Sequence, residues 1–145
     1  MDNNVNVLDE INKAATMGMD AIMFVYDKVG DQTFKQVLDG EYRKYKNISE
    51  RVITEYDNYS IKPPHSTNAM DKAMTWYGVQ MKTMKDQSNE KISELLVKGT
   101  NMGIIEGVRL QNQNQNTNLN ENVRKILDDF VIMQQDSVET LKKYL

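Results

Sequence analysis

The chain has 145 residues and a mass of 16.8 kDa, which fits one domain, 1–145, that can bury a core without covalent cross-links. It contains no cysteine and one histidine, His65, so thiol chemistry, disulfides and sites built from several histidines are excluded. The net charge of -3, without a cluster of Lys or Arg, disfavours nucleic-acid binding. Because no signal peptide or membrane-spanning stretch is evident, we expect a cytoplasmic protein with no membrane contact and no cofactor.

Apolar residues recur at alternating spacings of three and four along most of the chain, which is the spacing of one helix face. The pattern predicts helices over about 5–29, 32–60, 69–85, 89–115 and 120–144. In the first two helices the predicted buried face comprises Leu8, Ile11, Ala15, Gly18, Ile22, Val25 and Val29, then Phe34, Leu38, Glu41, Tyr45, Ile48, Val52, Glu55 and Tyr59. In the last two it comprises Ile92, Leu95, Gly99, Met102, Glu106 and Leu110, then Val123, Leu127, Phe130, Gln134, Ser137 or Val138, Leu141 and Leu145.

Short polar segments mark the helix boundaries. Gly30 and Asp31 predict a helix end followed at once by a new N-cap, so the first two helices should form an antiparallel hairpin. The consecutive prolines at 63–64 end the second helix, and residues 86–89 read as a capping break. The Gln/Asn run at 111–118 predicts a loop between the last two helices. Two hairpins joined by a long crossover predict an all-α, ferritin-like antiparallel four-helix bundle with a short extra crossover helix.

Glu41, Glu55, Glu106 and Gln134 occupy positions in these otherwise apolar faces. Burying a charged group is costly unless it is paired, so such exceptions are where function is sought. In helical bundles a di-metal centre takes one Glu from each of two helices and a Glu-x-x-His pair from each of the other two. A metal site and a structural polar layer are therefore the two interpretations of these positions.

Three segments carry a resemblance to the ferritin-like superfamily. Residues 39–45, Asp-Gly-Glu-Tyr-Arg-Lys-Tyr, resemble its Glu-x-x-His stretches, as do residues 134–145, which begin Gln-Gln-Asp-Ser and end Leu-Lys-Lys-Tyr-Leu. Residues 102–107, Met-Gly-Ile-Ile-Glu-Gly, resemble the segment that carries a lone Glu ligand. The likeness follows the helix order over nearly the whole chain and extends to a group of small, uncharacterised bacterial proteins of this fold. It implies the ferritin-like fold and a carboxylate-bridged metal site where the ligands are kept.

Carried over residue by residue, the resemblance places Glu41 and Glu106 at ligand positions. Lys44 and Ser137 stand where histidines are expected, and Gln134 stands where a glutamate is expected. We therefore expect a vestigial, metal-free polar layer in which Lys44 neutralises carboxylate charge. The favoured function is a non-catalytic bundle that acts through protein–protein contacts, as a homodimer, with its partner protein unknown.

The alternative is a metal-binding or oxidoreductase ferritin-like protein whose altered site uses Glu41 and Glu106, joined by Asp20 or Glu55. The missing histidines favour the first interpretation, because the loss of nitrogen ligands weakens a metal site. Nothing in the sequence resembles a phosphate-binding glycine loop, a nucleophile elbow or a zinc-protease helix.

Two further patterns concern packing. Gly99, Gly103 and Gly107 place small residues along one face of the fourth helix, which fits either a close crossing inside the chain or a dimer interface. The third helix has an adaptable Met-rich and aromatic face that suits either a packed core or a homodimer contact. This face consists of Met70, Met74, Trp76, Tyr77, Met81 and Met84.

Overall fold

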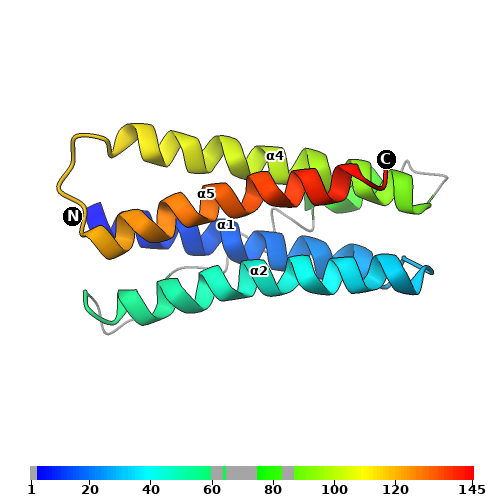
Figure 1. The fold of residues 1–145 in the computed structure, drawn as a ribbon, viewed down its shortest axis with the longest axis horizontal. Coiled ribbons are helices and arrows are strands. Elements are labelled where there is room, and N and C mark those ends of the chain that lie inside the picture. Colours follow the sequence, from blue (N-terminus) through cyan, green and yellow to red (C-terminus); the bar gives the residue numbers. More distant parts are fainter. Residues whose placement is uncertain (1–2, 60–63, 65–74, 83–86) are drawn as a thin grey trace.

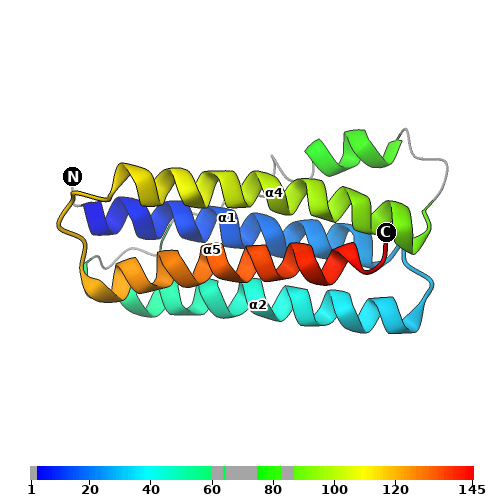
Figure 2. The same ribbon diagram turned by 45° about the horizontal axis from the view of Figure 1, so that its top comes forward.

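A computed structural model describes residues 3–59, 64, 75–82 and 87–145. Long helices packed side by side make up most of this part: α1 (Asn3–Tyr26), α2 (Gln32–Tyr56), α4 (Asn89–Gln113) and α5 (Glu121–Lys142) (Figure 1). Residues 75–82 form a further helical segment that lies beside α4 (Figure 2). No β-strand occurs in the described ranges, and the predicted all-α fold is confirmed.

The helices form two antiparallel hairpins, α1 with α2 and α4 with α5 (Figure 1). The end of α2 and the start of α4 lie at opposite ends of the molecule, so these two helices run in the same direction. Contacts of α1 with α4 and of α2 with α5 join the hairpins, and the core lies where the four apolar faces meet.

Most of the apolar side chains predicted to face inward on α1, α2 and α5 are buried. Phe34, Phe130, Leu8, Ile11 and Leu38 are among the largest side chains that lose nearly all contact with solvent. The ring of Phe130 meets that of Tyr45 edge to face at 6.4 Å between centroids, which links α5 to α2 in the middle of the core. The buried face of α1 is wider than the predicted one, since Asp9 and Asn12 are buried as well.

Local capping fixes where the helices begin. The Asp31 side chain accepts a hydrogen bond from the Phe34 amide at 3.1 Å, so the predicted N-cap at this position is confirmed. Within the predicted capping break at 86–89, Ser88 is the N-cap of α4 and accepts from the Lys91 amide at 3.4 Å. Asn120 caps α5 by accepting from the Asn122 amide at 2.9 Å. The helix ends differ from prediction by a few residues, because α1 stops at Tyr26 and α2 at Tyr56.

The loop predicted from the Gln/Asn run begins where α4 ends, at Gln113. Arg124 of α5 holds this loop, since its guanidinium donates to the carbonyl oxygens of Asn114 at 3.1 Å and Thr117 at 3.2 Å. Of the predicted helix 69–85, residues 75–82 are helical. Met70, Met74, Met84 and His65 lie outside the described residues.

The predicted buried face of α4 is wrong over its second half. The side chain of Glu106 is 61% exposed and Met102 is 43% exposed, whereas Leu96, Thr100 and Gly107 are buried. The buried Leu96, Thr100 and Gly107 each follow a member of the predicted series by one residue, which is about 100° around an α-helix. The predicted series therefore lies along the edge of the buried face, and Met102 and Glu106 reach solvent. No helix in the described ranges is long and apolar enough to cross a membrane.

Candidate functional site

A buried carboxylate, Glu41, lies in the core at the middle of α2. The residue is 3% exposed. Its Oε1 accepts from Lys44 Nζ at 2.9 Å, one helical turn further along α2. Its Oε2 accepts from the hydroxyl of Ser137 on α5 at 2.5 Å. Each carboxylate oxygen therefore has a donor supplied by the chain itself.

The pairing is asymmetric in its exposure to water. Lys44 keeps 40% of its side-chain surface exposed, while its partner carboxylate keeps 4%. The long lysine stem thus lets the ammonium group contact both the carboxylate and solvent. The cation keeps part of its hydration, so the pair avoids part of the desolvation cost of a fully buried ion pair. Lys44 supplies the neutralising charge expected from the sequence.

Gln134, on α5 one turn before Ser137, is 2% exposed. Its Nε2 is buried, and no acceptor in the described part of the chain lies within hydrogen-bonding distance of it. A buried amide without a partner costs about 1–3 kcal/mol. The residue therefore has unused donor capacity next to the Glu41 and Ser137 pair.

Glu106 does not join this layer, which corrects its assignment to the core. It points to solvent and pairs with Arg109 on the next turn of α4 at 2.5 Å. The buried face of α4 is centred one residue further along the chain, about 100° around the helix, which leaves Glu106 at its solvent edge. We refer to Glu41, Lys44, Gln134 and Ser137 as the polar layer.

The other carboxylates of the alternative site are not gathered around Glu41. Glu55 lies fourteen residues further along α2, about 21 Å away at 1.5 Å per residue, in a shallow surface pocket that also contains Lys125. Asp20 is partly buried on α1, and burial raises the pKa of its carboxyl group. Among the described residues no group of three or more His, Asp or Glu side chains is placed to hold a metal ion.

A cavity of about 680 Å³ opens beside the polar layer. One wall is the groove between α1 and α4, and Trp76 and Tyr77 of the 75–82 segment contribute to another. Its inner end is formed by Glu41, Gln134 and Ser137, together with core residues such as Phe130. The cavity therefore connects the surface between α1 and α4 with the polar side chains of α2 and α5. Its volume falls in the range of small-molecule sites.

Two tyrosines stand in the wall of this cavity. Burial raises the pKa of Tyr45 to about 12, opposed in part by a hydrogen bond with Thr100 and reinforced by the negative charge of Glu41. Burial also raises the pKa of Tyr77, and the nearby Tyr45 adds to the effect. Both phenols stay neutral at ordinary pH, so they present hydroxyl groups and no charge.

The glycines of α4 face side chains of the same chain. A Cβ atom added to Gly99 would collide with the hydroxyl of Tyr77, and one added to Gly103 would collide with Oε1 of Gln134. At Gly107 it would lie 2.8 Å from Cγ2 of Val131. The close crossing therefore involves the 75–82 segment and α5 inside one chain. The contacts that the described residues make account for all three glycines without a dimer interface.

The described residues of the Met-rich and aromatic face also pack inside the chain. Tyr77 is 5% exposed and Met81 is 7% exposed, so both belong to the core, and Trp76 is partly buried against it. Trp76 and Tyr77 meet edge to face at 4.7 Å. The members of this face that the structure describes are used in packing the 75–82 segment.

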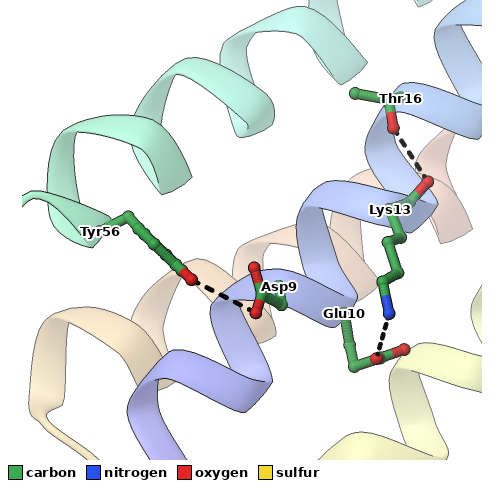
Figure 3. A network of polar contacts seen from close by, with 5 residues as sticks. All are labelled: Asp9, Glu10, Lys13, Thr16 and Tyr56. Carbon is green, nitrogen blue, oxygen red and sulfur yellow. Dashed lines mark hydrogen bonds and ion pairs between the residues drawn. The ribbon is translucent and has the colours of Figure 1, made fainter. Parts of the chain in front are cut away.

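A second set of buried polar side chains joins α1 to α2 near the other end of the hairpin. Tyr56 donates to Asp9 Oδ2 at 3.3 Å (Figure 3), and Ser49 donates to Asn12 Oδ1 at 2.7 Å. Burial raises the pKa of the Tyr56 phenol, and the negative charge of Asp9 raises it further. These residues lie beside the predicted buried faces, because a helix of a globular protein buries a stripe at least 100° wide and a spacing of three and four marks only its centre.

Comparisons with protein-family models, with curated proteins and with solved structures give no match to the chain.

Proposed function

We propose that the chain is a ferritin-like four-helix bundle that is metal-free and non-catalytic, and that it acts through protein–protein contacts as a homodimer. Two antiparallel hairpins in which α2 and α4 run in the same direction support this connectivity. The hydrogen bonding of the Glu41 carboxylate is the observation that supports the functional part of the proposal. Its two oxygens already accept from Lys44 and Ser137.

Metal binding at Glu41 would have to displace these two donors. Lys44 would be left without its partner, and its positive charge would remain beside the incoming cation. Gln134 and Ser137 are neutral, so they add no negative charge to offset a divalent ion. The polar layer thus holds one carboxylate and one ammonium group, which balance each other. A structural role suits this composition better than an ion site.

The outer face of α4 is the contact surface that we propose for the dimer. Met102 and Ile105 lie one turn apart on this face and are 43% and 55% exposed. The ion pair of Glu106 and Arg109 lies beside them, which gives the apolar pair a polar margin. Packing two copies across this face would remove both side chains from water, and no groups of the polar layer would be needed.

Metal content and mass in solution test the proposal together. Protein purified without chelator should contain far less than one equivalent of iron, manganese or zinc by plasma mass spectrometry. Light scattering during gel filtration should give about twice the chain mass of 16.8 kDa, and Ile105→Lys should shift the peak to one chain. Ile132→Lys is the matched control, because Ile132 is equally exposed on α5 at 54%. Stoichiometric metal would overturn the metal-free assignment, and a monomeric wild type would overturn the dimer.

A further inference from the structure

Apolar side chains border the mouth of the cavity between α1 and α4. Met17 of α1 is half-buried and Met102 of α4 is 43% exposed, and both line the cavity together with Ala14. Apolar surface left in water is unfavourable roughly in proportion to its area. A cover over this mouth would remove the two methionines and the lining behind them from water, and flexible methionine side chains adapt well to such a contact.

An ion pair on each of the two helices borders the same mouth. Lys13 pairs with Glu10 on α1, and Arg109 pairs with Glu106 on α4. All four residues line the cavity, and their side chains are between 36% and 61% exposed. On each helix the acid precedes the base by three residues, but α1 and α4 run in opposite directions (Figure 2). An α4 helix laid antiparallel over α1 therefore sets each charge against one of opposite sign.

The register that brings Arg109 over Glu10 also matches the rest of the rim. Counted in opposite directions along the two helices, the further pairs are Glu106 with Lys13, Ile105 with Ala14, Met102 with Met17, and Gln113 with Asn6. Opposite charges meet, apolar side chains meet, and amides meet. Spacings of three and four keep each rim row on one helix face. Complementarity of this kind fixes the register of a contact.

We propose that a second copy of the chain closes the cavity mouth, with α4 of each copy lying antiparallel over α1 of the other. A twofold axis parallel to the helices produces this arrangement, and each copy then gives and receives the same contact. The arrangement rests on the dimer proposed above and specifies which helix the outer face of α4 contacts. Met102 of the second copy lies over the mouth against Met17, so the two copies share one covered apolar space.

The other twofold arrangement packs α4 against α4 of the second copy and matches the rim less well. An axis perpendicular to the helices sets each helix antiparallel to its own copy. When Glu106 then lies against Arg109 of the second copy, the same register places Met102 against the polar Gln113. The charges would be paired, but the exposed methionine would meet an amide.

Exchange of the acid and the base within one helix tests the arrangement. Glu106→Arg with Arg109→Glu keeps an ion pair on α4 and makes each contact with α1 of the second copy a contact of like charges. The dissociation constant of the dimer, measured by sedimentation at a series of concentrations, should rise about tenfold or more. Glu10→Lys with Lys13→Glu should have the same effect. The four changes together should restore the wild-type value.

The matched control is Glu139→Lys with Lys142→Glu, because this α5 pair has the same spacing and lies outside the cavity. It should leave the dissociation constant unchanged. Packing of α4 on α4 stays complementary after either exchange, so an unchanged dissociation constant in both would overturn this arrangement and leave the dimer standing. Weakening that the four changes together do not reverse would also overturn it. A monomeric wild type would overturn the dimer and the arrangement together, and the occupant of the mouth would then be something other than a second copy.

The absence of cysteine allows a second measurement that leaves the charges intact. The proteins Met17→Cys and Met102→Cys are mixed, left to exchange subunits and treated with a short bis-maleimide. Dimers linked from position 17 to position 102 should be the main product by mass spectrometry. Efficient linking of Met102→Cys to itself would indicate α4 on α4 and overturn the arrangement. Ile132→Cys, at a similarly exposed position on α5, is the control and should link with neither.

Discussion

Replacing Gly18 by alanine would place a Cβ atom 2.5 Å from Cε1, 2.6 Å from Cδ1 and 2.7 Å from Cζ of the Tyr45 ring. Real Cβ atoms essentially never approach other heavy atoms that closely, so the ring has to move. Tyr45 is 5% exposed and its ring packs against Phe130, so movement disturbs the core between α1, α2 and α5. Overpacking of this kind costs about 1–3 kcal/mol.

The same change also removes the flexibility of a glycine in a helix interior, which stabilises by about 1 kcal/mol. Gly40→Ala in the middle of α2 isolates this second effect, because an added Cβ there meets no heavy atom within 4 Å. We expect Gly40→Ala to raise the free energy of unfolding by about 1 kcal/mol and Gly18→Ala to fall about 1–3 kcal/mol below it. Urea denaturation followed by circular dichroism measures both values.

A rescue variant ties the loss to the ring itself. In a Tyr45→Val background the side chain ends at Cγ, so the clashing Cδ1, Cε1 and Cζ atoms are removed and Gly18→Ala should then behave like Gly40→Ala. If Gly18→Ala stabilises the wild type as much as Gly40→Ala does, the close packing of α1 against Tyr45 is refuted. Gly18 and Tyr45 would then not be in contact in the wall of the cavity that both residues line.

Lys44→Met should lower the free energy of unfolding by about 1–2 kcal/mol, because it leaves the buried Glu41 carboxylate without its cation. The loss is smaller than for a fully buried pair because the lysine side chain is partly exposed. Adding Glu41→Gln to Lys44→Met should restore most of the lost stability. An equal cost of Lys44→Met with and without Glu41→Gln in urea denaturation would contradict the pairing. Burial raises the pKa of Asp129, but hydrogen bonds and charges from Arg51 and a neighbouring lysine outweigh it and lower the pKa below its usual value. A carboxyl group whose pKa is lower in the folded state contributes stability that is present above its usual pKa of about 4 and is lost as pH falls through the folded value. Arg51→Ala should therefore flatten the decline in stability below about pH 5, and an unchanged acid profile would argue against the pairing. Because the pKa of Tyr45 is raised to about 12, the neutral phenol contributes stability that is fully present below about pH 10 and is lost as pH rises toward 12. Tyr45→Phe should therefore weaken the decline in stability at alkaline pH, and an identical alkaline slope would speak against burial of the phenol.

Much of the fold follows from local patterns. The spacing of apolar residues places the four long helices, because an amphipathic helix buries one continuous apolar stripe along its length. The caps at Asp31 and Ser88 are equally local, since each side chain bonds an amide three residues away. The antiparallel hairpins follow from the short connection at Gly30 and from the polar loop after α4.

The candidate site could be predicted only in part. Glu41, Gln134 and Ser137 fall on strongly periodic faces, and all three are buried. Glu106 was placed with them because one register was followed along α4, and a register error of a fraction of a turn is enough to move a side chain from the core to solvent. The Asp9 and Tyr56 contact was missed because each residue stands at the edge of its helix face.

The sequence by itself determined the all-α class, most helix boundaries, the absence of thiol chemistry and the polar residues of α2 and α5. These are properties of spacing and composition within single segments. The tertiary structure alone decided that Lys44 and Ser137 share the oxygens of one carboxylate, and that the α4 glycines receive Tyr77, Gln134 and Val131. It also decided that a cavity lined by Tyr45, Tyr77 and Gln134 opens between α1 and α4. Each of these depends on the rotation of one helix against another, which a repeat of three and four residues does not specify closely enough.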